Sequence, residues 1–269
     1  MLLVALLLGL IFGVSYWYTA NQDIENPAIA EEQEPQQEPV NEPTDVELEE
    51  LPVVNGFRQF SGNEFRLFYD NLLQPDLLRV ELPPEIYGND EADTRIRQIA
   101  EARGYRLRSS PSITLPFVDG HQLHEAVHQP WLDMKAAATQ DGLSMSIVSA
   151  YRSVEQQRQL FISRLNARGI SVTDIVNGTA DEQINDVLIT SSIPGYSKHH
   201  TGYTIDLLCN GYAFENFKNS PCFIWLSARN YENAKKYGFI PSYPSDASLQ
   251  GPDPEEWEYV WVGIDLLRI

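Results

Sequence analysis

A change of composition near residue 56 separates a part of this chain that can form a compact domain from a part that cannot. Residues 19–55 are rich in Glu, Gln, Pro and Asn and poor in aromatic side chains. Such a segment buries too little apolar surface to offset the entropy lost on folding. We therefore predict an acidic, disordered linker at 19–55, extended by its own charge repulsion, and ordered structure from Gly56 onward.

The stretch before this linker has the composition of a membrane-associated segment. Residues 1–18 are almost continuously apolar, contain no Asp, Glu, Lys, Arg or His and end in Trp17 and Tyr18. This length is just sufficient to cross a bilayer, and aromatic residues are common at the interface. A cleaved signal peptide is the alternative, but it usually has a basic beginning and small residues before the cleavage site. We favour an uncleaved anchor, and both alternatives predict an exported protein of the cell envelope.

The acidity of the chain is concentrated in the linker. Residues 21–57 contain eleven Asp or Glu and no Lys or Arg, so they account for −11 of the net charge of −19. The remaining −8 is ordinary for a soluble acidic domain. A negatively charged protein of this kind is not suited to nucleic acid as a partner.

The two cysteines, Cys209 and Cys222, are thirteen residues apart. In an exported protein this spacing indicates a disulfide that closes a short loop. Two unpaired thiols are the alternative. A cysteine metal site is not expected, because the pair lacks the close spacing of zinc-binding cysteines.

The remainder of the chain has the pattern of helices mixed with a few short strands. Hydrophobic spacing and capping residues predict helices within 57–73, 92–105, 124–142, 153–169, 179–195 and 224–238. Strands are predicted at 143–151, 203–208, 239–240 and 257–263. Together these elements predict an α+β fold in which helices pack around a small antiparallel sheet. We expect residues 56–120 to form an N-terminal extension that packs on a main domain at 121–269.

The segment 197–207, SKHHTGYTIDL, contains the residues with the clearest potential for metal chemistry. His199 and Asp206 supply an imidazole and a carboxylate, and both groups are good zinc ligands. Gly202 between them allows the chain to turn from a loop into a strand. A single His–Asp pair is more often a structural hydrogen bond than a metal site, so this segment alone leaves both interpretations open.

Four segments, in order along the second half of the chain, resemble one family of enzymes. PGYSKHHTGYTID (194–206) is similar to the S-x-H-x-x-G-x-x-x-D signature of D-alanyl-D-alanine carboxypeptidases of the vancomycin-resistance type, which are zinc peptidases of bacterial cell-wall metabolism. SAYRSVEQQ (149–157) resembles the S-x-Y-R-S-x-x-x-Q signature of the same family. NAKKYGFIPSYP (233–244) and EEWEYVWVG (255–263) stand in the places of its last two signatures. The resemblance implies the zinc-peptidase fold that this family shares with hedgehog domains, and a peptidase domain at 121–269.

The resemblance also implies a role for each matching residue. His199 and Asp206 would be zinc ligands, and Glu255 would be the general base that activates water. Arg152 would bind the C-terminal carboxylate of a peptide, because its planar fork of donors suits that group. Further contacts with the substrate would come from Ser149, Gln157 and Ser197.

Glu258 is the point at which the chain departs from the family pattern, which has a histidine ligand there. Glu258 itself can act as the third ligand, since a His–Asp–Glu set is chemically acceptable. A second alternative is a metal that is bound weakly or replaced. The third is another histidine as ligand, and the candidates are His200, His121, His124 and His128.

The resemblance therefore implies a zinc-dependent carboxypeptidase that removes a C-terminal D-amino acid from peptidoglycan stem peptides. The competing hypothesis is a catalytically inactive protein that binds cell-wall peptides through Arg152. The expected cofactor is Zn²⁺, and the expected partners are the stem peptide and, through residues 1–18, a membrane. We expect a monomer that does not bind nucleic acid.

Overall fold

The structure is a computed structural model that describes residues 46–269. The predicted membrane segment and most of the predicted linker lie outside the described residues. Within them, no helix combines the length and the apolar character needed to cross a membrane. The predicted start of order at Gly56 requires correction. Leu51 is 7% exposed in a hydrophobic core, and strand β1 (Val53–Val54) pairs with β2 (Phe57–Arg58), so residues before Gly56 belong to the folded part.

A four-stranded antiparallel sheet with the strand order β7-β8-β10-β9 forms the centre of the fold. Its strands are β7 (Met145–Ser149), β8 (Thr204–Cys209), β10 (Glu255–Trp261) and β9 (Phe239–Tyr243). Two further ladders pair β3 (Leu77–Leu78) with β4 (Ser110–Pro111), and β5 (Phe117–Val118) with β6 (His121–Gln122). The predicted α+β class with a small antiparallel sheet is confirmed.

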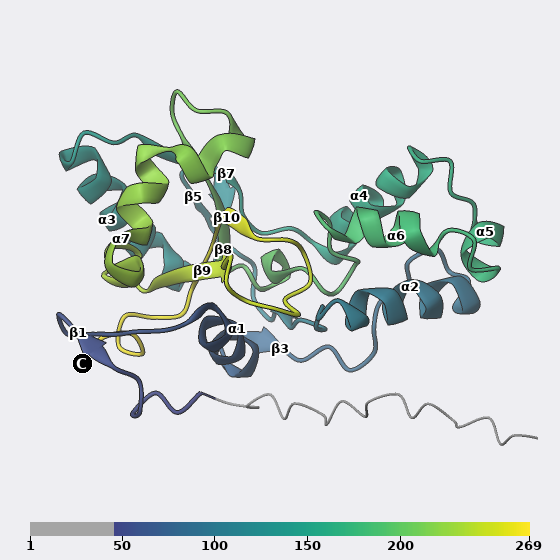
Figure 1. Cartoon of the computed structure of the whole chain (residues 1–269), viewed down its shortest axis with the longest axis horizontal. Coiled ribbons are helices and arrows are strands. Elements are labelled where there is room, and N and C mark those ends of the chain that lie inside the picture. Colours follow the sequence, from purple (N-terminus) through teal and green to yellow (C-terminus); the bar gives the residue numbers. More distant parts are fainter. Residues whose placement is uncertain (1–45) are drawn as a thin grey trace, which may run out of the picture. The chain divides into compact units, whose positions relative to one another are not determined.

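Three helices accompany this sheet (Figure 1): α1 (Gly62–Asn71), α3 (Glu125–Gln140) and α7 (Pro221–Lys235). Helix α1 contacts β9, α3 contacts β7, and α7 contacts β8 and β9. Their apolar faces and the strands bury one core, in which Trp131, Tyr203 and Tyr259 are fully buried. Helix α1 lies in the predicted N-terminal extension, so this portion of the extension belongs to the same core as the sheet.

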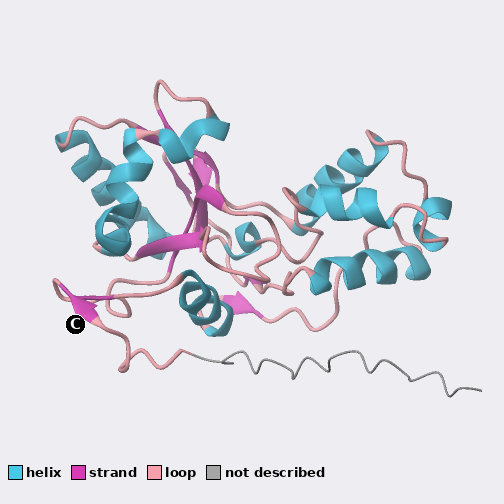
Figure 2. Ribbon diagram, viewed as in Figure 1, coloured by secondary structure: helices cyan, strands magenta, loops and turns pink. Residues whose placement is uncertain are grey.

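A second group of helices has a core of its own (Figure 2): α2 (Asp90–Ala102), α4 (Val154–Asn166), α5 (Val172–Val176) and α6 (Asp181–Leu188). Helix α2 contacts α5 and α6, and α4 contacts α6. Ile96, Phe161 and Ile184 are fully buried between these helices. Two short 3-10 helices, η1 (Lys198–Thr201) and η2 (Phe214–Asn219), follow in the chain.

Side-chain caps explain where several helices begin. Ser153 and Gln156 form a reciprocal capping box at α4, so the start predicted at Ser153 is confirmed. The same arrangement of Ser61 and Glu64 begins α1. Each cap satisfies amide donors that the first turn leaves without a helical partner.

Other details of the prediction differ from the structure. Helix α3 begins at Glu125, so Pro130 lies in its second turn. The predicted helix at 179–195 is only Asp181–Leu188. Helix α7 is interrupted where Arg229, Asn230 and Tyr231 adopt left-handed backbone angles. The side-chain amide of Asn230 donates to the Phe60 carbonyl, and its Oδ1 accepts from the Phe60 backbone amide. These two hydrogen bonds hold the interruption against the segment that contains Phe60.

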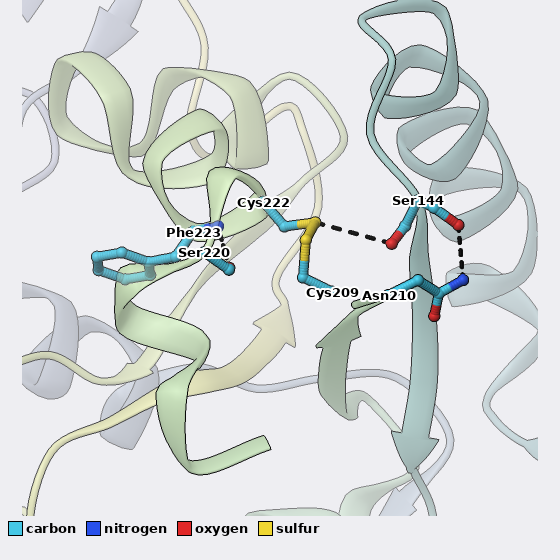
Figure 3. The surroundings of a disulfide bond; sticks show 6 residues. All are labelled: Ser144, Cys209, Asn210, Ser220, Cys222 and Phe223. Carbon is cyan, nitrogen blue, oxygen red and sulfur yellow. Dashed lines mark hydrogen bonds between the residues drawn. A yellow bond between two sulfur atoms is a disulfide. The ribbon is translucent and has the colours of Figure 1, made fainter. Parts of the chain in front are cut away.

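Cys209 and Cys222 form a disulfide that links the end of β8 to the first turn of α7, with a Cα–Cα distance of 5.7 Å (Figure 3). Both cysteines are buried. Nearby, the Asn210 amide donates to the Ser144 hydroxyl at 2.7 Å, so β8 is also joined to the residues that precede β7. The disulfide therefore links helix α7 to the sheet that carries Asp206.

We expect the double variant Cys209→Ala/Cys222→Ala to be less stable than the oxidised chain. A disulfide closing a loop of this size lowers the entropy of the unfolded state and contributes about 3 kcal/mol. Urea unfolding followed by circular dichroism should show the lower free energy of unfolding, and dithiothreitol should destabilise the unsubstituted chain to a similar degree. If the unreduced chain titrates as two free thiols, the disulfide is refuted.

Candidate metal centre

Three predicted ligands come together at the end of the central sheet. His199 lies on η1, whereas Asp206 and Glu258 lie directly opposite each other on β8 and β10. The Nε2 atom of His199 is 3.3 Å from Asp206 Oδ2 and 3.3 Å from Glu258 Oε2. One potential ligand atom from each residue lies within 4.8 Å of the other two, and all three residues are buried. Cross-strand pairing thus brings two carboxylates to the same imidazole.

The backbone around His199 determines which ring nitrogen faces the carboxylates. Its Nδ1 atom is 2.6 Å from the Ala150 carbonyl, so Nδ1 carries a proton and Nε2 points to the other side. The Ser197 hydroxyl caps η1 by accepting from the His199 amide. Gly202 ends η1 with a φ of 78°, and a Cβ atom there would lie 2.7 Å from Leu115 Cδ1. Only glycine therefore makes this turn into β8 without strain or collision.

The environment of these three side chains suits a cation. Asp206 Oδ1 and Glu258 Oε1 are buried and have no hydrogen-bond partner within residues 46–269. Burial alone would lower the pKa of His199, but the two carboxylates raise it to about 10. Buried carboxylates without partners are costly unless a positive charge compensates them. Oxygen and nitrogen donors of this kind fit Zn²⁺ with one coordination position left for another ligand.

Glu255 faces the same pocket as Glu258 although the two residues are three positions apart on one strand. In a regular strand such residues point to opposite faces. Here the pairing of β10 with β9 shifts its register between Glu255 and Tyr259, and this irregularity changes the direction of Glu255. Burial, followed by the charges of Glu258 and Asp206, raises the pKa of Glu255 well above its usual range. A carboxyl group in this environment can hold a proton at neutral pH.

Arg152 lines the pocket from the segment between β7 and α4. Its Nη1 donates to Gln157 Oε1 at 2.8 Å and its Nη2 donates to the Ser149 hydroxyl at 3.1 Å. Ser149 and Gln157, which were expected to contact the substrate, are not among the residues that line the pocket. They hold Arg152 instead, and Gln157 is in turn anchored by donating to the Ser192 carbonyl. Ser197 does line the pocket.

The other histidines are engaged elsewhere. Both ring nitrogens of His200 have partners, because one accepts from the Gly195 amide and the other is 2.7 Å from the Arg152 carbonyl. His124 caps α3 and contacts Asp76, and His128 contacts the Leu123 carbonyl. None of the alternative histidines is among the residues that line the pocket. Within the described part of the chain, the arrangement favours Glu258 as the third ligand.

The pocket has a volume of about 420 Å³ and combines residues of the central sheet with residues of α4, the two 3-10 helices and the segments between these elements. Several of its lining residues were not singled out from the sequence: Tyr105, Leu160, Arg164, Thr190, Ser191, Ser192, Phe214 and Tyr243. The three consecutive hydroxyl residues at 190–192 are a sequence signal by which this part of the pocket could have been predicted. No comparable signal marks Tyr105, which reaches the pocket from the N-terminal extension and donates to the Leu188 carbonyl.

Comparison with known proteins places these features in a family. A family model, VanY, D-alanyl-D-alanine carboxypeptidase, matches residues 120–264. The chain is 28% identical over 141 residues to the D-alanyl-D-alanine carboxypeptidase of Enterococcus faecalis, covering 51% of this chain and 47% of that protein. It is 29% identical over 130 residues to a protein of the same name from Enterococcus faecium, covering 46% of this chain and 41% of that protein. The chain thus spans less than half the length of these relatives.

Solved structures with similar coordinates include a vancomycin-resistance D,D-pentapeptidase VanY variant in complex with Zn(II). It is 22% identical, with a TM-score of 0.46, and the match covers 62% of this chain and 90% of that chain. The LD-carboxypeptidase LdcB matches at 20% identity and a TM-score of 0.45, over 82% of this chain and 89% of that chain. The region matched by the family model, residues 120–264, is more than half of this chain of 269 residues and contains all four motifs. This chain therefore belongs to the VanY family of D-alanyl-D-alanine carboxypeptidases.

Proposed function

We propose that this chain is a zinc-dependent carboxypeptidase that removes a C-terminal D-amino acid from peptidoglycan stem peptides. The observation that supports this most strongly is the convergence of His199, Asp206 and Glu258 in a pocket that Glu255 and Arg152 also line. A metal-binding group, a candidate proton carrier and a carboxylate-binding cation are the three components that hydrolysis at a free C-terminus requires. Family membership supports the same reaction class.

His199, Asp206 and Glu258 would hold the metal through Nε2 and one oxygen of each carboxylate. Zinc in such a site supplies Lewis-acid chemistry, because it makes water more acidic and polarises a carbonyl group. The Ala150 carbonyl keeps His199 in the tautomer that presents Nε2. The cross-strand pairing of Asp206 with Glu258 keeps both carboxylates on one side of the sheet.

Glu255 acts as the proton carrier in this proposal. It accepts a proton from the attacking water and later gives this proton to the amine of the departing amino acid. Its raised pKa, caused by burial and by the neighbouring carboxylates, suits the second of these steps because the protonated form is then accessible. Because the register of β10 shifts after Glu255, this side chain lines the same pocket as Glu258 without belonging to the group of three ligands.

Arg152 binds the C-terminal carboxylate and so restricts cleavage to the last peptide bond. Gln157 and Ser149 accept hydrogen bonds from the two terminal nitrogens of its guanidinium group. This support reduces the entropy that Arg152 loses when it binds a carboxylate. Ser197 contributes a hydroxyl group to the same pocket.

The function is tested by incubating the full chain with a stem pentapeptide that ends in D-Ala-D-Ala. We expect mass spectrometry to show loss of one alanine residue, and a chiral assay to identify the product as D-alanine. The same peptide with a C-terminal amide should remain intact, because Arg152 then has no carboxylate to bind. Stoichiometric zinc with no turnover of the free-acid peptide would favour a catalytically inactive peptide-binding protein.

Arg152→Met should reduce kcat/KM for this peptide by about 10- to 100-fold, since hydrogen bonds to charged groups contribute about 1.5–3 kcal/mol. The loss should be mainly in KM, because Arg152 contacts the part of the substrate that does not react. Arg158→Met is the matched control. Arg158 lies on α4, shortly after Arg152 in the chain, but it binds the Ile86 carbonyl and pairs with Glu155. An equal loss in both variants would contradict the role of Arg152.

We also propose that the protein is exported and tethered to the membrane by residues 1–18, with 19–45 as a spacer and 121–269 as the peptidase domain. The apolar composition of the first segment supports the tether, and the Cys209–Cys222 disulfide is consistent with an oxidising compartment. Cell-wall substrates lie in that same compartment. We propose that the folded part acts as a monomer, because one copy carries every group used above.

A further inference from the structure

The pocket contains a second arginine that the proposed reaction does not use. Arg164 lies in the last turn of α4, and its guanidinium lines the same pocket as Arg152. Its Nη1 donates to the Thr190 carbonyl at 2.6 Å and contacts the Thr190 hydroxyl at 3.2 Å. The side chain is therefore anchored through one nitrogen to the segment between α6 and η1.

The remaining donors of Arg164 have no acceptor within residues 46–269. Neither its Nε nor its Nη2 atom forms a hydrogen bond there, and no carboxylate in this part of the chain lies within ion-pair distance of it. Nε and Nη2 together form the two-pronged edge with which a guanidinium binds a carboxylate. Arg152 likewise has no carboxylate partner among the described residues, because its terminal nitrogens bind Gln157 and Ser149.

The two guanidinium groups affect each other electrostatically. Burial lowers the pKa of Arg164, and the positive charge of Arg152 lowers it further, whereas Glu255 acts in the opposite direction. The two arginines and the residues Thr190, Ser191 and Ser192 thus line the same pocket. The carboxylates around His199 line this pocket as well. A ligand with a single carboxylate brings one negative charge to a pocket that two arginines line.

We propose that Arg164 is a specificity-determining residue that binds a second carboxylate, so that the preferred substrate is a peptide with an acidic side chain in addition to its free C-terminus. This inference rests on the proposed function, because it takes Arg152 as the group that binds the terminal carboxylate. Ser191 and Ser192 line the same pocket as Arg164. A charged, two-pronged contact in a partly desolvated pocket discriminates strongly against an amide of the same shape.

The test compares pairs of peptides that end in D-Ala-D-Ala and differ only in Glu versus Gln, placed either third or fourth from the C-terminus. Dissociation constants are measured by isothermal titration calorimetry with the zinc-loaded full chain carrying Glu255→Gln, so that no peptide is consumed. For at least one position the Glu peptide should bind about 10-fold or more tightly than its Gln partner, as expected for a hydrogen bond to a charged group.

Arg164→Met should reduce the ratio of the two dissociation constants, Gln peptide over Glu peptide, to about one. Arg164→Lys should restore part of this ratio, because lysine keeps the positive charge but lacks the two-pronged guanidinium group. Arg168→Met is the matched control, since it removes the same charge just beyond the end of α4 from a side chain that binds only the Arg164 carbonyl. The control should keep the full ratio. Measurable binding of the Gln peptide shows that each variant is folded.

The inference is overturned if the unsubstituted pocket does not distinguish Glu from Gln, or if the preference persists in Arg164→Met. It is also overturned if Arg164→Met weakens the binding of the Glu and the Gln peptide equally. Both arginines would then bind the C-terminal carboxylate that the two peptides share. Release of D-alanine is measured separately with Glu255 restored. A preference that depends on Arg164 without D-alanine release would refute the proposed function and leave the inference intact.

Discussion

Replacement of Glu258 by alanine should remove most of the zinc affinity of this chain. The Glu258 carboxylate is 3.3 Å from His199 Nε2 and lies opposite Asp206, so the variant keeps only two of the three converging ligands. Loss of a residue that merely orients a ligand weakens metal binding by about 10- to 100-fold, so loss of a ligand should cost about 100-fold or more. Competition with a chromophoric chelator at pH 7 measures the dissociation constant.

Glu256→Ala is the matched control for this experiment. Glu256 is on the same strand but forms an ion pair with Lys218 instead of facing His199, so its replacement should leave zinc binding unchanged. Glu258→His should bind zinc, because it supplies the ligand type that the family pattern has at this position. Unchanged zinc affinity in Glu258→Ala would mean that the third ligand is elsewhere.

Replacement of Glu255 by glutamine should reduce kcat by about 100- to 10,000-fold, which is the usual contribution of general acid–base catalysis. Glutamine has nearly the same shape but does not accept and return a proton. The zinc affinity should change much less than in Glu258→Ala, because Glu255 is not one of the three converging ligands. Stopped assays of D-alanine release, together with the chelator competition, separate these two effects.

Activity that persists in Glu255→Gln would show that another group moves the proton. Loss of zinc together with activity would show instead that Glu255 is a ligand. Because Glu255 and Glu258 lie close together in the pocket, the pair of variants is informative only when both properties are measured in each.

The parts of the fold that the sequence predicted well are those determined by local signals. Ser153 forms the predicted cap of α4, and the strand predicted at 203–208 is β8 with a shift of one residue. His199 and Asp206 were identified as candidate ligands from their side-chain types and the resemblance of their segment to a family signature, and the turn expected at Gly202 does occur at that residue. The apolar core followed from the same local patterns.

The parts that were missed depend on contacts between distant segments. Glu258 was one of three alternatives for the third ligand, and its position beside Asp206 results from the pairing of β10 with β8. The direction of Glu255 depends on a change of register that no residue type indicates. Arg164 and Tyr105 reach the pocket only because the second group of helices packs beside it. Ordered structure before Gly56 was not predicted, because the acidic composition of this segment indicated a disordered linker. Leu51 is nevertheless buried in the core.

The most direct test of the account is a titration of zinc into the metal-free full chain while the release of D-alanine from a pentapeptide ending in D-Ala-D-Ala is followed. We predict that activity rises in proportion to added zinc and stops rising at one equivalent per chain, because a single group of three ligands is present within residues 46–269. Activity that does not depend on zinc, or zinc that binds without D-alanine release, would contradict the account.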